Sequence, residues 1–112
     1  MVQHAKRCER DSYGGEGMTE AQELEILKDA LYHFGYSHQQ TKCIEEMSEL
    51  TKEFCKEKDG KGDIEHIAEE IADVYITLDQ MVIYNDIYEK VKDYRESKMR
   101  RLRYLIFMEQ YG

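Results

Sequence analysis

The chain has 112 residues, of which 24 are acidic and 16 are Lys or Arg, so its formal net charge is −8. That length is typical of one domain, and so short a chain buries only a modest core, which favours oligomers. The acidic balance argues against nucleic-acid binding through a broad basic face. No apolar run approaches the ~20 residues of a membrane span. We expect no membrane partner and no secretory signal.

The cysteines are few and unpaired in sequence. Cys8, Cys43 and Cys55 form no Cys-x-x-Cys pair, and their number is odd. This usage is typical of reduced thiols. We therefore predict a cytoplasmic protein.

Two segments of different character follow one another. Residues 1–18 mix basic residues and glycines without a helical period, which predicts a flexible N-terminal extension. Residues 19–112 read as helix throughout, and the absence of Pro agrees with this. We predict an all-α domain whose four helices begin near Thr19, Ser37, Asp63 and Asp86. Capping-box patterns open the first, second and fourth helices.

Each predicted helix carries apolar residues at helical spacing. The third, from about residue 63 to 85, is apolar around most of its circumference, as is typical of a central helix. A short four-helix monomer cannot easily cover such a helix, so we predict at least a dimer with most aromatic residues in the core. Asp79 falls inside the apolar arc without an evident role.

Two short acidic motifs stand on the second and third predicted helices. Residues three apart share a helix face, so two packed helices could bring four carboxylates together: Glu46, Glu49, Glu70 and Asp73. Ionised carboxylates crowd only around a counter-charge, and Mg²⁺ prefers oxygen ligands. In a chain this acidic, chance alone gives the bare spacing about once. Two solvated helix faces are therefore the alternative.

Polar residues continue both motifs along their helices at alternating spacings of three and four. The two stripes are Gln39, Lys42, Glu46, Glu49 and Glu53, then Glu70, Asp73, Thr77, Gln80 and Tyr84. Each stripe lies about 120° from the apolar centre of its helix, in the same rotational sense. This arrangement predicts a polar groove beside the core, although two wet faces fit it as well.

The two motifs together resemble the MazG-like, all-α nucleoside triphosphate pyrophosphohydrolases, in particular short bacterial or phage-type members. Their signature is Glu-Glu-x-x-Glu, here residues 45–49, then a spacer and Glu-x-x-Asp, here residues 70–73. Gln39 and Gln80 match polar positions that flank the motifs in relatives. The run 98–102 is similar to a late basic Lys-x-x-Arg-Leu element. The resemblance covers roughly residues 24–106.

The resemblance implies a four-helix module that forms a homodimer or homotetramer. It also implies Mg²⁺-dependent hydrolysis, with Mn²⁺ as a substitute, of a nucleoside or deoxynucleoside triphosphate to the monophosphate and pyrophosphate. Housecleaning of the nucleotide pool is the process that such an activity would serve. The preferred base and sugar do not follow from the sequence.

The chemistry of the residues and the resemblance together give three sets of candidate site residues. The metal ligands are Glu46, Glu49, Glu70 and Asp73; the catalytic set is Glu45, Glu49 and Lys98; the substrate-binding set is Gln39, Gln80, Tyr84, Arg95, Lys98 and Arg101. Glu45 points about 100° away from Glu46, so it is either a supporting base or a surface residue. The basic residues of the fourth helix also suit a simple C-terminal helix charge.

Two other functions compete with this interpretation. One is a catalytically weak helical dimer that acts as an interaction or regulatory module, against which the intact set of acids speaks. The other is a di-iron carboxylate bundle, which needs Glu-x-x-His on two helices. No Glu precedes a His by three residues here, so the di-iron site is disfavoured.

Overall fold

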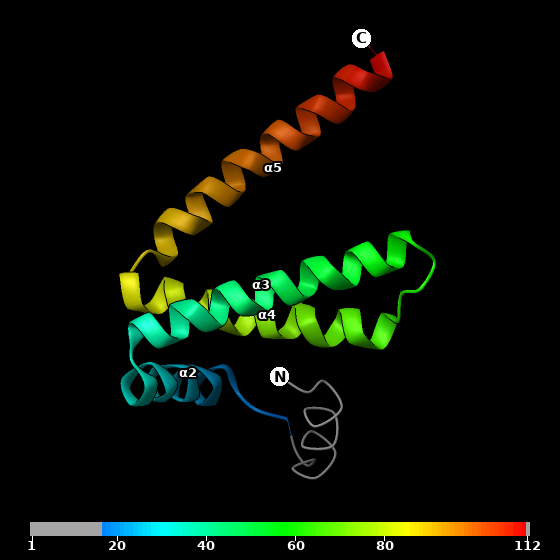
Figure 1. Cartoon of the computed structure of the whole chain (residues 1–112). Coiled ribbons are helices and arrows are strands. Elements are labelled where there is room, and N and C mark those ends of the chain that lie inside the picture. The colour runs from blue at the N-terminus through cyan, green and yellow to red at the C-terminus, as the bar shows by residue number, and fades with distance from the viewer. Residues whose placement is uncertain (1–16, 112) are drawn as a thin grey trace. The chain divides into compact units, whose positions relative to one another are not determined.

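The computed structural model describes residues 17–111, and within that range it contains four helices and no strand. They are α2 (Glu20–Phe34), α3 (Tyr36–Lys58), α4 (Ile64–Asn85) and α5 (Tyr88–Tyr111), as Figure 1 shows. The all-helical expectation is confirmed. The predicted N-terminal extension lies outside the described residues except for Gly17 and Met18, which precede α2 without regular structure.

Helix α2 begins and ends where its sequence predicts. The Gln22 backbone N–H donates to Thr19 Oγ1 at 3.1 Å, and the Thr19 N–H donates to Gln22 Oε1 at 2.9 Å. This reciprocal pair confirms the capping box. Gly35 follows with φ of 89°, a conformation that L side chains rarely adopt, and it alone separates α2 from α3.

Two predicted helix starts are displaced by one or two residues, and the predicted cap at Ser37 does not form. Helix α3 begins at Tyr36 with Gly35 as its cap and no side-chain cap bond, because the one-residue connection leaves Ser37 already inside the helix. Helix α5 begins at Tyr88 rather than at Asp86, since Asp86 takes φ of 51° and turns the chain between the helices.

The turn between α3 and α4 matches the predicted helix breaker. At Gly62 an added Cβ would lie 2.7 Å from the Cα of Glu57, so only glycine fits there without a shift. Asp63 then accepts a hydrogen bond from the Glu65 N–H at 2.9 Å, and α4 begins at Ile64. This tight turn returns α4 alongside α3 as a helical hairpin (Figure 1).

The chain divides into two compact units, of which one ends at Met81 and the other begins at Val82. In the first unit α3 and α4 form the hairpin, and α2 contacts α3. The second unit contains the last residues of α4 and all of α5, whose residues from 88 to 110 are exposed. No described helix is both long enough and apolar enough to cross a bilayer.

The side of the hairpin where α3 and α4 face each other, here called the seam, is mainly polar. Six of the nine buried residues in the described part of the chain are polar or charged: Gln39, Glu46, Glu53, Glu70, Thr77 and Gln80. The buried apolar residues are Cys43, Ile67 and Val74. The stripes predicted to form a groove beside the core are therefore the best-buried part of the hairpin.

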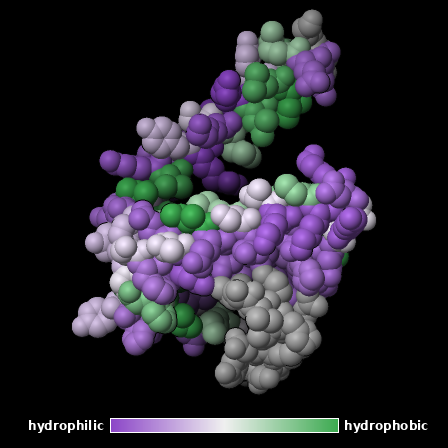
Figure 2. Space-filling model, viewed as in Figure 1, coloured by the Kyte–Doolittle hydropathy of each residue, from purple (hydrophilic) through white to green (hydrophobic). Residues whose placement is uncertain are grey.

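The apolar stripes of the hairpin are largely exposed. Ile44 on α3 is 56% exposed and Leu78 on α4 is 41% exposed. Steps of 100° per residue place both stripes on the same side of the antiparallel pair. The expectation that most aromatic residues are in the core is wrong for the single chain, because Phe54, Tyr75 and others lie at its surface. Figure 2 likewise shows apolar side chains at the surface of α2 and α5.

Candidate functional site

The centre of the seam holds three carboxylates from two helices. Glu46 on α3 and Glu70 and Asp73 on α4 each place one oxygen within 4.8 Å of the others. Glu70 is fully buried, Glu46 is 3% exposed and Asp73 is partly buried. The spacing of three on α4 puts its two acids on one face, and the hairpin turn brings that face against α3. The sequence predicted this convergence.

Two other predicted acids lie at the edge of this group. Glu49 is not one of the three, and its side chain is 44% exposed and 4.0 Å from Lys52 Nζ. Glu45 is 57% exposed, and its Oε2 lies 3.5 Å from Lys42 Nζ. Both stay close to the three acids along the helix, Glu45 as the next residue to Glu46 and Glu49 one turn later. Their predicted roles stay predictions.

Lys42 lies close to one acid inside the seam and to one acid outside it. Its Nζ lies 3.5 Å from Glu45 Oε2 and 3.9 Å from Glu46 Oε1. The lysine therefore supplies positive charge to one member of the acid group from one turn away. Burying several carboxylates is costly unless cations or protons balance them. The seam is consequently a place where an added cation would be favourable.

The three acids fit a magnesium ion by their chemistry and spacing. All the donors are carboxylate oxygens, which hard cations prefer. Ligands at about 2.1 Å from Mg²⁺ lie about 3 Å apart when adjacent and about 4 Å apart when opposite. Oxygens already within 4.8 Å need only small side-chain movements to reach that spacing. Mg²⁺ also usually keeps several waters, so three protein ligands suffice.

Glu53 is a buried acid to which the sequence analysis gave no role. It is 5% exposed, one oxygen lies 3.4 Å from Lys56 Nζ, and the other has no hydrogen-bond partner among residues 17–111. Its position seven residues after Glu46 already placed it on the polar stripe. That spacing was the available signal, but the family signature ends at Glu49 and so gave Glu53 no function.

At the other end of the seam, two amides join the helices. Gln39 Nε2 donates to Gln80 Oε1 at 2.8 Å, and His38 Nδ1 lies 2.8 Å from Gln39 Oε1. Gln39 is 7% exposed and Gln80 is 2% exposed. The structure thus brings together two predicted substrate-binding residues that are 41 positions apart in sequence. His38 belongs to neither the predicted metal set nor the predicted substrate set.

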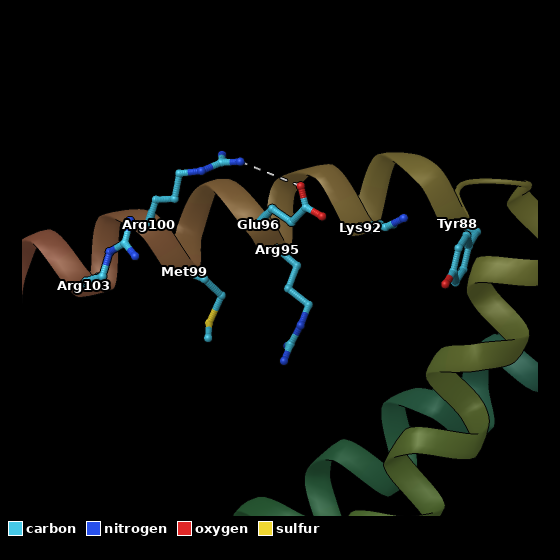
Figure 3. Close-up of a pocket in the computed structure, with 7 residues that line it drawn as sticks. All are labelled: Tyr88, Lys92, Arg95, Glu96, Met99, Arg100 and Arg103. Atoms are coloured by element: carbon cyan, nitrogen blue, oxygen red, sulfur yellow. Dashed lines mark ion pairs between the residues drawn. The ribbon is translucent and has the colours of Figure 1, made fainter.

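The remaining predicted site residues belong to the second unit. Tyr84, on the last turn of α4, is 57% exposed. On α5 a pocket is lined by Tyr88, Lys92, Arg95, Glu96, Met99, Arg100 and Arg103. Figure 3 shows Arg95 and Met99 extending to the same side of α5, while Arg100 turns toward Glu96, 3.9 Å away. Lys98 and Arg101 are exposed and are not among the lining residues.

Asp79 can now be explained. It is exposed, and nine residues after Glu70 it lies about 180° around α4 from that buried acid. Its charge therefore faces away from the seam. The free thiols in the described range are the buried Cys43 and the exposed Cys55, whereas Cys8 lies outside that range.

Comparison with known proteins gives no relative for the chain: no family model, no curated protein and no solved structure matches it.

Proposed function

We propose that this protein is a magnesium-dependent pyrophosphohydrolase that cleaves a nucleoside or deoxynucleoside triphosphate to the monophosphate and pyrophosphate. The observation that carries the proposal is the convergence of Glu46, Glu70 and Asp73 in the seam. Three acids are gathered at the place where charge is most expensive to bury. A helical fold that only needed stability would fill such a seam with apolar side chains.

The reaction needs a metal to neutralise the triphosphate and to make water more acidic, and Mg²⁺ supplies both when it is bound. Glu46, Glu70 and Asp73 are the side chains that would hold it. Water attacks the α-phosphorus, a new P–O bond forms, and the bond from that phosphorus to the oxygen bridging the α- and β-phosphates breaks. Pyrophosphate leaves with that bridging oxygen.

The acids at the edge of the seam suit the proton transfer in this reaction. Glu49 is one turn from Glu46, and its partly exposed carboxylate lies 4.0 Å from Lys52 Nζ. In the proposal Glu49 accepts the proton of the attacking water or joins the metal ligands, and Glu45 supports it. Lys42, which contacts both Glu45 and Glu46, holds this part of α3 in place.

Helix α5 supplies the positive charge in the proposal. Five of the nine residues from 95 to 103 are Lys or Arg. A triphosphate carries more negative charge than a few metal ions neutralise, and charged hydrogen bonds to phosphate are strong. Lys98 and Arg101, with Arg95, are assigned to the phosphate tail on charge and on the resemblance of this element to the family's basic motif.

The proposal includes self-association. The apolar side of the hairpin, which holds Ile44, Met47, Leu78 and their neighbours, is exposed in the single chain. Contiguous apolar surface of this kind marks an interface. A second copy is the partner that the proposal assigns, which gives a homodimer or, by pairing of dimers, a homotetramer. The same exposed face is the feature that favours the rival function of a noncatalytic helical interaction module.

The test is to identify the products. Purified full-length protein is incubated with each of the common nucleoside and deoxynucleoside triphosphates and MgCl₂, and phosphates are separated by ion-exchange chromatography. We expect pyrophosphate and a monophosphate in equal amounts, with no orthophosphate at early times. Orthophosphate together with a diphosphate would show cleavage at the γ-phosphate and overturn the proposal. No hydrolysis of any nucleotide would favour the interaction module.

A further inference from the structure

A directional chain of hydrogen bonds runs from His38 through Gln39 to Gln80. The His38 ring nitrogen Nδ1 lies 2.8 Å from the carbonyl oxygen Oε1 of Gln39, and the amide Nε2 of Gln39 donates to Oε1 of Gln80, also at 2.8 Å. A carbonyl oxygen only accepts, so Nδ1 must carry the hydrogen. Each amide has one accepting and one donating end. The position of the hydrogen on the His38 ring therefore sets the donor-to-acceptor direction of both hydrogen bonds.

Gln80, the last residue in this series of hydrogen bonds, presents a donor. Gln80 Oε1 is occupied by Gln39, which leaves the Gln80 amide NH₂ to face whatever lies next to it. Gln80 is 2% exposed, so this NH₂ is held at a nearly buried position. A donor at such a position favours a neighbouring acceptor over a second donor. Gln80 is thus prepared for an incoming acceptor.

His38 is held by a second contact. Its ring stacks on Phe34, with centroids 5.3 Å apart and planes 20° from parallel. Phe34 is the last residue of α2, so this contact ties the ring to a neighbouring helix as well as to Gln39. Two independent contacts therefore orient the imidazole. The ring cannot easily turn to offer Gln39 a different nitrogen.

The amide pair stands at a constant offset from the acid group. Gln39 precedes Glu46 by seven residues, and Gln80 follows Asp73 by seven. Seven residues are two helical turns, or about 10.5 Å of rise. Both helices thus carry an acid and an amide on the same seam-facing side. A nucleotide whose phosphates lie at the acids, with its sugar along the seam toward residue 39, brings its base to the amides.

We propose that the His38–Gln39–Gln80 chain selects the nucleobase, and that it favours a base with a carbonyl group over one with an amino group at the edge that meets Gln80. The substrate class is then uracil, thymine, guanine or hypoxanthine nucleotides rather than cytosine or adenine nucleotides. This inference rests on the proposed function. His38 acts as a positioning residue, because it fixes the direction of the chain without touching the base.

The opposite direction of these hydrogen bonds shows why His38 determines which group Gln80 offers to the base. If His38 carried its hydrogen on Nε2 instead, Nδ1 would accept from the Gln39 amide and Gln39 Oε1 would accept from Gln80. Gln80 would then offer its carbonyl oxygen, which accepts from an amino group. Removal of the Nδ1 hydrogen should therefore relax or reverse the selection. A site that hydrogen-bonds one group strongly rejects the analogue that leaves its buried polar atoms unpaired.

The first experiment compares dUTP with dCTP, which differ at this edge in a carbonyl and an amino group. For the wild-type protein with MgCl₂ we expect kcat/KM to be roughly tenfold to a hundredfold higher for dUTP. Gln80→Glu keeps an oxygen for Gln39 but replaces the donor by an acceptor, and it should invert that ratio. His38→Phe keeps the ring stacked on Phe34 but removes the N–H, and it should bring the ratio to within about threefold of unity.

His33→Phe is the matched control, because His33 also contacts Phe34, edge-on at 4.7 Å, but is not part of the chain of hydrogen bonds. It should leave the ratio unchanged. Binding of the non-hydrolysable α,β-imido analogues of both nucleotides, measured by calorimetry, should show the same order without turnover. The ¹⁵N shifts of the His38 ring should show a protonated Nδ1 and a bare Nε2. His38→Phe should leave the affinity for Mg²⁺ unchanged.

The possible results separate this inference from the proposed function. Hydrolysis of both nucleotides at equal rates, or a ratio that His38→Phe and Gln80→Glu leave unchanged, would overturn the base selection and leave the pyrophosphohydrolase standing. Selection of dCTP by the wild-type protein would overturn it as well. Failure to bind or cleave any nucleotide would overturn both.

Discussion

The α3–α4 hairpin and α5 differ in the sign and in the burial of their charged residues. The hairpin places acids where its two helices meet, and α4 contains five acidic residues and no Lys or Arg. Helix α5 contains seven Lys and Arg residues against four acids, and its residues from 88 to 110 are exposed. Exposed charge costs little, whereas buried charge must be balanced. The buried acids of the hairpin are therefore much stronger indicators of function than the basic surface of α5.

The difference between buried and exposed acids should be largest in a matched pair on α4. Asp73→Asn removes a charge from the acid group with almost no change in volume, and we expect kcat/KM to fall more than a hundredfold, since even residues that only support metal ligands contribute tenfold to a hundredfold. Asp79→Asn changes the exposed opposite side of the same helix and should change kcat/KM less than twofold. Steady-state kinetics at saturating MgCl₂ measure both. Equal effects would remove the acid group from the mechanism.

The apolar side of the hairpin should behave as an interface. Ile44→Glu places a charge on that side, and it should break the predicted dimer because a carboxylate cannot be buried unpaired among apolar groups. Lys52→Glu places a Glu at an exposed position about 140° around α3 from the centre of that side and should leave assembly intact. Sedimentation velocity at micromolar concentration reports the mass of each species. A stable wild-type monomer would contradict the prediction.

Much of this fold follows from local sequence signals. The capping box at Thr19 and the glycines of the 59–62 turn set helix ends directly. The starts of α3 and α5 could not be predicted, because they depend on the positive φ of Gly35 and Asp86. Capping patterns at Ser37 and Asp86 gave misleading starts. Local patterns do not show which of several candidate residues the chain uses as its turn.

The site was predictable in part for a similar reason. Helical spacing placed Glu46, Glu70 and Asp73 on converging faces, and the structure brings them together. Spacing could not rank acids within one stripe by burial, so Glu53 was passed over and the partly exposed Glu49 was included. The apolar stripes were predicted correctly as stripes. Their exposure in the single chain depends on tertiary packing, which periodicity does not describe.

Magnesium should stabilise the hairpin specifically. A ligand at 100 times its Kd adds about 2.7 kcal/mol to the free energy of unfolding, which corresponds to a rise in Tm of about 10 °C for a domain of this size. Wild-type protein and Asp79→Asn should show this rise in thermal denaturation, and Asp73→Asn should lose most of it. A rise of equal size in Asp73→Asn would show that the ion binds elsewhere, for example at exposed acids.

The smallest expected effect concerns α5 and decides whether its exposed charge has a function. Lys98 lies four residues from both Tyr94 and Leu102, so it interrupts an apolar stripe, whereas Lys90 lies about 80° away around α5 and has Asp86 and Asp93 among its neighbours. Substitution by Met keeps the length and packing of the stem and removes only the charge. Lys98→Met should lower kcat/KM for triphosphates by tenfold to a hundredfold, about 1.5–3 kcal/mol, as expected for a charged hydrogen bond to phosphate. Lys90→Met should change kcat/KM by less than twofold.

Both variants should keep the rise in Tm with Mg²⁺, because neither changes the acid group. If α5 only carries solvated charge, the two substitutions will have equal and small effects, and the phosphate-binding cations must then be sought on the hairpin, where Lys42 already contacts Glu46.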